Sequence, residues 1–173
     1  EAVERIQALA SALEALDPTP APARADALLR GRWRLLYSSF GLQRQATLGR
    51  LSFNTLPKDE PITVQRLFQE VDPATGLYDN VVEYADAAGQ PGVSLTIGRF
   101  APASDVRMDV VFTHAQASGH ERAPIDNARI PPLWSEVTYL DEDFRLNRGS
   151  YGSLYVLALD ERAPARWSRD ALG

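Results

Sequence analysis

The sequence predicts a mainly β domain, an antiparallel barrel or sandwich of about eight strands that follows an N-terminal helical segment. Beyond residue 31, apolar residues recur at every second position, as in half-buried strands. Turn-forming residues separate these runs at short, regular intervals. The 173 residues fit one domain, and closure into a barrel would leave no exposed sheet edge.

Residues 1–23 are predicted to form a helix followed by a proline linker. Apolar side chains recur at helical spacing from Val3 to Leu16, and charged side chains occupy the other faces. Pro18 ends the helix because its ring disfavours helical geometry at Asp17. The apolar face is mostly alanine and leucine and the polar face is not basic. We therefore expect this helix to pack on its own barrel rather than to lie on a membrane.

The barrel domain is predicted over residues 24–160. A short helix over 24–30 should open it and end at Gly31. Strands are expected at 32–40, 47–56, 62–71, 77–85, 93–100 and 106–114. Residues 115–132 are expected to form a polar loop, and residues 161–173 a polar tail without regular structure.

The stretch 139–157 is predicted to form a hairpin with an unusual return strand. Three acidic residues, 141–143, separate two β-prone runs, which is typical of a polar turn. The return strand carries Arg145 and Arg148, and Gly149 then interrupts it. Glycine weakens a strand, so we expect a bulge, a bend or a close backbone approach at that point.

Composition and motifs argue against several functions. The chain has no cysteine, which excludes disulfides and thiol chemistry, and a net charge of -5 argues against a nucleic-acid partner. His114 and His120 do not have the spacing of metal ligands, and no serine lies in a nucleophile elbow. Asp141 and Asp143 fall in a turn exposed to water, where pKa shifts are small. We expect no enzyme, no cofactor and no metal.

A second motif lies at the start of the predicted barrel, where Gly31 and Trp33 precede Leu-Leu-Tyr-Ser-Ser at residues 35–39. This opening and the 139–157 hairpin together resemble the plastid lipid-associated protein (fibrillin) family. The resemblance covers residues 24–159. It implies a lipocalin-like barrel and points to a cyanobacterial member of the family.

The resemblance also assigns roles to motif residues. Trp33 would plug the closed end of the barrel beneath one arginine of the hairpin, and Asp141 would accept backbone N–H bonds in the turn. We expect Arg148 to be the inward arginine, because it shares a strand face with Phe144 and Leu146. Binding of an acidic lipid head group by the arginines is the alternative to stacking on the tryptophan. The motif residues are Gly31, Trp33, Tyr37, Tyr139, Asp141, Arg145, Arg148 and Gly149.

The family is linked to carotenoid, quinone or fatty-acid-like ligands and is not known as catalytic. The resemblance therefore implies a non-catalytic carrier or structural protein for carotenoid, prenylquinone or acyl lipid at thylakoid or plastoglobule-type membranes. It would be found in the cyanobacterial cytoplasm or at thylakoids, or in a plastid after removal of a transit peptide. The candidate lipid-binding interior consists of Val93, Leu95, Ile97, Val106, Met108, Val110 and Phe112.

Two other functions remain open. A solid barrel with an apolar outer patch would instead serve as a scaffold for an enzyme of prenylquinone or pigment biosynthesis. A bilin chaperone or lyase is the third reading, because such proteins also use a small lipocalin barrel. The expected partner is a hydrophobic small molecule or lipid; peripheral membrane contact and a protein partner are further options, and no nucleic acid is expected.

Overall fold

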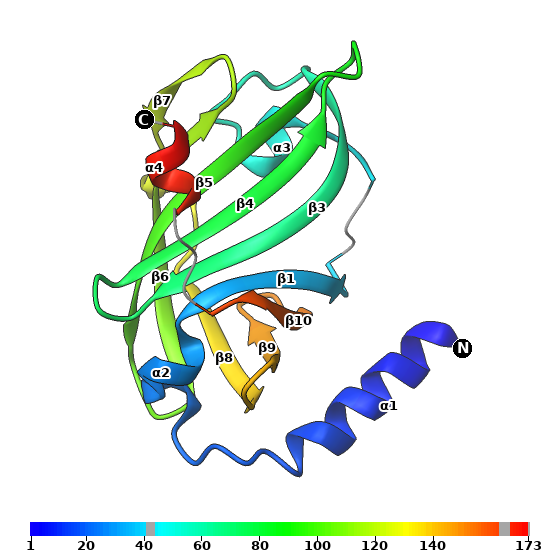
Figure 1. Ribbon diagram of the computed structural model, residues 1–173, viewed down its shortest axis with the longest axis vertical. Helices are drawn as coiled ribbons and strands as arrows, with labels where there is room; N and C mark the ends of the chain where they lie inside the picture. Colours follow the sequence, from blue (N-terminus) through cyan, green and yellow to red (C-terminus); the bar gives the residue numbers. More distant parts are fainter. Residues whose placement is uncertain (41–43, 163–166, 173) are drawn as a thin grey trace.

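A closed antiparallel barrel forms the centre of the molecule (Figure 1), in a computed structural model that describes residues 1–40, 44–162 and 167–172. Its eight strands among these residues are β1 (Gly31–Ser38), β3 (Pro61–Asp72), β4 (Leu77–Ala85), β5 (Pro91–Pro102), β6 (Arg107–Ala117), β8 (Leu133–Leu140), β9 (Phe144–Gly149) and β10 (Leu154–Glu161). Strand β1 pairs with both β10 and β3, which closes the ring. The predicted mainly β barrel is confirmed.

Two further short strands of the described chain lie outside this ring. Strand β2 (Gln45–Thr47) pairs with β3, and β7 (His120–Pro124) pairs with β6. The expected strand at 47–56 is wrong, because the chain turns into helix α3 (Leu48–Leu51), which the Thr47 side chain caps. The expected loop at 115–132 contains β7 and the short 3-10 helix η2 (Asn127–Arg129).

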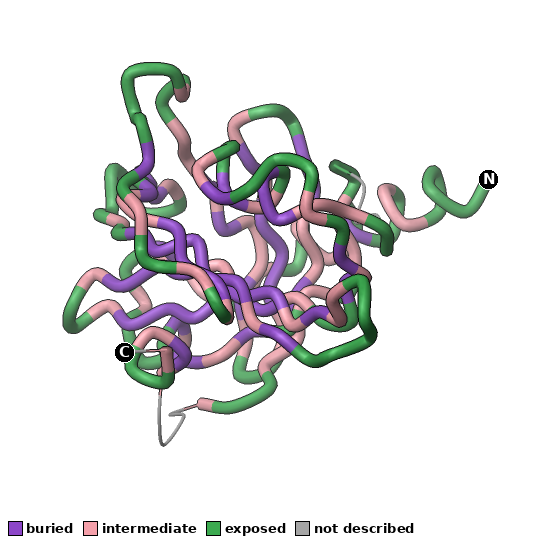
Figure 2. Tube along the Cα trace, turned by 90° about the horizontal axis from the view of Figure 1, so that it is seen from above, coloured by how far each residue is buried: buried purple, intermediate pink, exposed green. Residues whose placement is uncertain are grey.

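Short helices occupy the two ends of the barrel. Helix α2 (Asp26–Leu29), preceded by the 3-10 helix η1 (Pro22–Arg24), lies where β1 begins, and α3 lies at the opposite end (Figure 1). The longer helix α1 (Ala2–Glu14) lies outside the barrel, and its N-terminal end projects away from the body (Figure 2). In the described part of the chain, no helix combines the length and apolar character needed to span a membrane.

Helix α1 packs against the outer face of β9 and β10. Ala10 is buried there against Leu146 and Leu154, and Ile6 and Leu13 add to the same cluster. The helix thus covers apolar side chains that point away from the barrel interior. The expectation that it packs on its own barrel is confirmed.

Helix α4 (Ser168–Leu172) covers a second outer patch, on β3, β4 and β5 (Figure 1). Leu172 packs against a cluster that contains Phe68, Leu95 and Ile97. The expectation of a tail without regular structure is wrong for this segment, although residues 163–166 and 173 of the tail lie outside the described residues.

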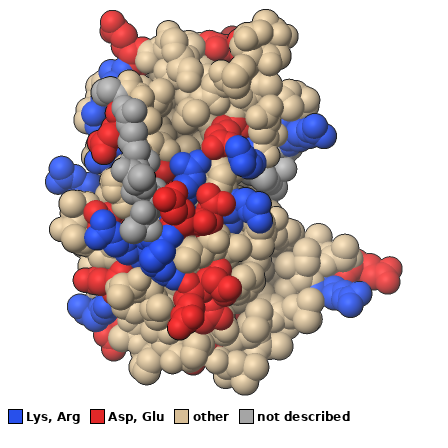
Figure 3. Space-filling model, viewed as in Figure 1, with Lys and Arg blue, Asp and Glu red and all other residues tan. Residues whose placement is uncertain are grey.

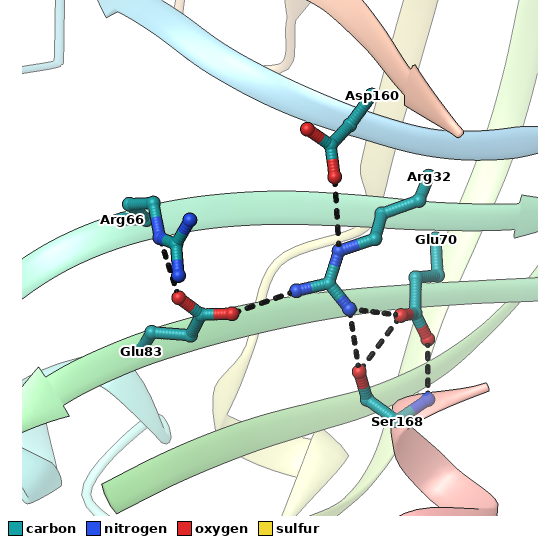
Figure 4. A network of polar contacts seen from close by, with 6 residues as sticks. All are labelled: Arg32, Arg66, Glu70, Glu83, Asp160 and Ser168. Atoms are coloured by element: carbon teal, nitrogen blue, oxygen red, sulfur yellow. Dashed lines mark hydrogen bonds and ion pairs between the residues drawn. The ribbon is translucent and has the colours of Figure 1, made fainter. Parts of the chain in front are cut away.

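An ion-pair network anchors α4 to the barrel (Figure 4). The guanidinium of Arg32 contacts Glu70 and Glu83 at 2.9 Å each, and Ser168 donates to Glu70 from its backbone N at 3.0 Å and its hydroxyl at 2.7 Å. Arg32 also lies over the Phe68 ring, 3.9 Å from its centroid. On the face seen in Figure 3, positive and negative side chains are interspersed rather than gathered by sign.

Candidate functional site

The barrel encloses a cavity of about 330 Å³ that reaches the end carrying α3. This volume lies at the lower end of the range for small-molecule sites, about 300–1,000 Å³. Alternate residues of each strand point inward, and most of those that form the walls are apolar. The apolar wall residues are Leu35, Val64, Leu67, Val82, Val110, Phe112, Leu133 and Leu157.

Trp33 lies at the other end of the barrel, where its side chain is fully buried. Its Nε1 donates a hydrogen bond of 2.8 Å to the carbonyl oxygen of Leu29 in α2, which satisfies the indole N–H. The guanidinium groups of Arg145 and Arg162 lie over the ring, at 4.8 and 5.6 Å from its centroid. Such contacts combine cation–π attraction with packing of the arginine stems.

Gly31 allows β1 to begin in close contact with the end of β10. Its φ is +150°, and a Cβ atom there would lie 2.7 Å from Cδ1 of Leu159 and 2.8 Å from the carbonyl oxygen of Glu161. Any side chain at this position would force the backbone apart. The glycine two residues before Trp33 therefore permits the strand approach that places the indole at the barrel end.

Arg145, and not Arg148, is the inward arginine of the hairpin. Arg145 is fully buried in the barrel, whereas Arg148 lies outside it and donates to Glu14 of α1 at 2.8 and 3.0 Å. The expectation that Arg148 points inward is wrong. Phe144 and Leu146 do share its face, but they pack beneath α1 on the outside of the barrel. An apolar strand face can be buried by a helix as well as by a barrel interior.

Asp141 holds the turn between β8 and β9. Its Oδ1 accepts backbone N–H bonds from Asp143 at 3.0 Å and Phe144 at 2.8 Å, and its Oδ2 accepts the hydroxyl of Tyr139 at 2.7 Å. Partial burial acts to raise the pKa of Asp141, but these hydrogen bonds outweigh it, and the pKa lies below its usual value. The interactions of Asp141 are those of a turn residue.

The remaining motif residues divide between the outer face and the cavity. Tyr37 and Tyr139 belong to the cluster beneath α1. Gly149 lines the cavity, and a Cβ atom there would lie 2.9 Å from the Tyr155 ring. The two tyrosines therefore do not contribute to the cavity wall.

The candidate interior residues of β5 prove to face outward. Val93, Leu95 and Ile97 belong to the cluster beneath α4, so their assignment to the interior is wrong. Their neighbours Ser94 and Thr96 face inward instead, and the Thr96 hydroxyl donates to the Leu51 carbonyl oxygen of α3 at 2.7 Å. Alternation shows which residues share a face, but it does not show which face is interior when a helix covers the outer face as well.

The candidate residues of β6 behave differently. Val110 and Phe112 line the cavity, and Met108 is buried in the main core between the cavity and the closed end. Val106 precedes the strand and is 42% exposed, so its interior assignment is wrong. A lipid-binding role for the inward residues remains a prediction.

A polar layer separates the apolar walls from Trp33. Gln69 is the partner of Trp33 in the β1–β3 pairing, and it accepts a hydrogen bond from Nη2 of Arg145. The Gln69 amide in turn donates to Asn80 at 3.3 Å. Both amide side chains line the cavity. Sequence reasoning missed them, because a polar residue in an alternating strand is ordinarily assigned to the solvent face.

No role was assigned to Arg162 from the sequence either. Its Nη1 donates to the backbone carbonyl oxygens of Ala27, Leu28 and Arg30, at 3.3 Å for Ala27 and 3.1 Å for Arg30. Cationic side chains often satisfy the unpaired carbonyls at the end of a helix in this way. An arginine just beyond a strand carries no sequence signal for such a contact, which depends on the pairing of β1 with β10.

Aromatic side chains surround the open end of the cavity. Phe40, Phe53 and Tyr151 line it and are 64%, 41% and 61% exposed. The Phe53 ring lies 5.6 Å from that of Phe112 inside the barrel, so the apolar surface continues from the entrance into the cavity. Neighbouring exposed apolar side chains of this kind commonly mark a binding surface.

The histidines take part in polar contacts. His120 Nε2 lies 2.9 Å from a carboxylate oxygen of Glu60, and His114 Nδ1 lies 3.1 Å from the Thr113 hydroxyl. Within residues 1–40, 44–162 and 167–172, no group of three or more acidic or histidine side chains is arranged to hold a metal ion.

A closed eight-stranded barrel with one plugged end, one open end and an apolar cavity has the architecture of a lipocalin-like protein. The PAP_fibrillin family model matches residues 1–158. The chain belongs to the PAP/fibrillin family, the plastid lipid-associated proteins.

Curated relatives carry names from the same family. Probable plastid-lipid-associated protein 2 of Arabidopsis thaliana is 30% identical over 86% of this chain and 60% of its own length. Chromoplast-specific carotenoid-associated protein of Cucumis sativus is 29% identical over 86% of this chain and 58% of its own. Plastid-lipid-associated protein 6 of Arabidopsis thaliana is 28% identical, over 76% and 52%. The chain therefore spans about half to three fifths of these relatives. Comparison with solved structures finds no significant match.

Proposed function

We propose that this chain is a non-catalytic carrier or structural protein that binds a hydrophobic lipid chain inside its barrel. The observation that carries the proposal is the apolar cavity of about 330 Å³, closed by Trp33 at one end and bordered by exposed aromatic side chains at the other. A cavity with apolar walls and a few polar groups is the usual form of a site for a small hydrophobic ligand.

The size of the cavity restricts the ligand. If each methylene takes up roughly the 30 Å³ of a liquid water molecule, the cavity holds a chain of roughly ten carbons. Burying them contributes up to about 8 kcal/mol, at about 0.8 kcal/mol per methylene. An acyl chain or the end of an isoprenoid chain fits this space. A whole carotenoid has several times as many carbons and would extend through the mouth.

The names of the relatives support a lipid ligand and a site of action. They describe proteins associated with plastid lipid or with carotenoid, in chloroplasts or chromoplasts. By analogy, this chain would act at thylakoid or plastoglobule-type lipid, in a plastid or a cyanobacterium. The exposed aromatic side chains at the mouth would contact the lipid surface while a chain passes into the barrel.

Native mass spectrometry of the protein purified from its own host, followed by lipid extraction, tests the proposal. We expect a stoichiometric lipid with at least one unbranched or isoprenoid chain. Recovery of the protein with a stoichiometric enzyme and no lipid would instead favour the scaffold hypothesis.

A pair of variants on one strand shows whether the ligand lies in the cavity. Val110→Trp fills the cavity, because Val110 lines it, whereas Val111→Trp adds the same bulk to a side that is 52% exposed. We expect the first variant to lose lipid binding at least tenfold and the second to retain it. Equal binding by the two variants would contradict the cavity as the site.

A further inference from the structure

Arg145 is a fully buried cation without an ionic partner among the described residues. Only its Nη2 finds an acceptor, the amide oxygen of Gln69, while Nε and Nη1 have no hydrogen-bond partner. Burial lowers the pKa of this guanidinium to about 10, so it remains charged at neutral pH. The Trp33 ring, 4.8 Å away, offsets part of the cost of burial but offers no hydrogen-bond acceptor in the plane of the guanidinium.

The buried carboxylates of the barrel, unlike Arg145, do have ionic partners. Asp79, which is also fully buried, receives Arg169 at 2.9 and 2.5 Å and a backbone N–H from Gly98 at 2.9 Å. Glu70 is equally buried and is paired with Arg32. Among the residues that the structure describes, these buried carboxylates are paired with arginines, whereas the buried cation of Arg145 has no carboxylate partner. Arg145 does not itself line the cavity, but Gln69, the acceptor of its hydrogen bond, does.

Arg145 lies on β9 just beyond the inner end of the cavity. It shares the inward face of β9 with Asn147, two residues further toward the mouth, and Asn147 lines the cavity. The Asn147 amide donates to the Ser135 hydroxyl at 2.7 Å and leaves its own oxygen unpaired. Turned about its last bond, this amide would accept from Ser135 and hold its NH₂ as an unused donor behind the cavity wall. Unused hydrogen-bonding groups and an unpaired positive charge therefore lie directly behind the inner end of the apolar space.

We propose that the inner end of the cavity binds the anionic head group of a single-chain amphiphile, with a carboxylate as the chemical class, and that the chain runs outward to the mouth. Arg145 supplies the charge, and the amides of Gln69 and Asn147 supply hydrogen bonds. This inference rests on the proposed lipid-binding function and adds the orientation and head group of the ligand. A carboxylate at the inner end would accept from the amides that line it and place a negative charge close to the unpaired guanidinium.

The test compares decanoate, methyl decanoate and decanol, which share one chain, by calorimetry on the full, delipidated protein at neutral pH. We expect decanoate to bind at least tenfold more tightly than the other two, because hydrogen bonds to a charged partner are stronger than neutral ones. Equal binding of all three would overturn the inference and leave the proposed function intact. If none of the three binds, the proposed function fails as well.

Variants connect the preference to Arg145. Arg145→Met retains an apolar stem over Trp33 and should abolish the preference for decanoate. Arg107→Met is the matched control, because Arg107 also stacks on a tryptophan, Trp134 at 4.7 Å, but does not line the cavity. If Arg145→Met does not fold, Asn147→Leu serves instead and should reduce the preference several-fold. Full preference in a folded Arg145→Met or in Asn147→Leu would overturn the inference.

The ionisation of the bound ligand gives an independent readout. Carbon NMR of carboxyl-labelled decanoate follows its titration in the free and bound states. Next to a buried guanidinium, the bound carboxyl should stay ionised to lower pH than the free acid. A bound carboxyl that titrates at or above the free value would place the head group at the mouth or in an apolar environment, and so would overturn the proposal.

Discussion

Replacing Arg148 by alanine should release helix α1 and leave the barrel intact. Arg148 lies outside the barrel, with Nε and Nη2 bound to the two carboxylate oxygens of Glu14 at 2.8 and 3.0 Å. Its Nη1 also donates to Gln7 at 3.0 Å, so all three contacts join β9 to α1. The variant removes each of them without changing any residue that lines the cavity.

The magnitude follows from the geometry and exposure of the pair. The side chains of Arg148 and Glu14 are 26% and 21% exposed, so solvent screens the pair less than it screens a surface ion pair. Two parallel charge-assisted bonds in this setting should contribute about 1–2 kcal/mol. That corresponds to roughly a tenfold change in the equilibrium between docked and undocked α1.

Hydrogen exchange read by mass spectrometry measures this equilibrium. A helix of 13 residues is marginal when isolated in water, so undocked α1 should lose the protection of its amides. We expect α1 in Arg148→Ala to exchange roughly tenfold faster, with unchanged exchange in the barrel strands. Arg107→Ala removes an arginine of the outer face of β6 and serves as the control. Unchanged exchange in α1, together with a large loss of barrel stability, would refute the outward placement of Arg148.

Three further predictions follow from the same contacts. Partial burial acts to raise the pKa of Glu14, but its hydrogen bonds to Arg148 and Thr138 outweigh this and leave the pKa below 4.5. The docking of α1 should therefore be complete above pH 4.5 and weaken as the pH falls through the lowered pKa. Hydrogen exchange at several pH values, compared with Glu14→Gln, measures this dependence. Trp33→Phe loses the bond to α2 and part of the packing at the barrel end, and should cost about 2 kcal/mol in urea unfolding. Arg169→Ala leaves Asp79 buried without its cation and should cost about 3 kcal/mol, whereas Asp79→Asn combined with Arg169→Ala should recover part of that loss.

The pattern of apolar residues predicted the strands of the barrel well but not their inward faces. On β5 it placed Val93, Leu95 and Ile97 inside, and on β9 it placed Arg148 inside, and both assignments were reversed. The cause was the same in each case: a helix distant in sequence covers the outer face, so an apolar face does not distinguish inside from outside. On β6, where the outer face is exposed, the alternation placed Val110 correctly in the interior.

The sequence by itself determined most strands of the barrel, the helix at the start, the Gly-x-Trp opening and the family, because these depend on local periodicity, turn chemistry and short motifs. The tertiary structure alone decided which arginine lies over Trp33 and which residues line the cavity. It also left Arg145 as a buried cation without a carboxylate among the described residues. These features depend on which strands pair across the closure and on where α1 and α4 dock, and such long-range packing leaves no period in the sequence.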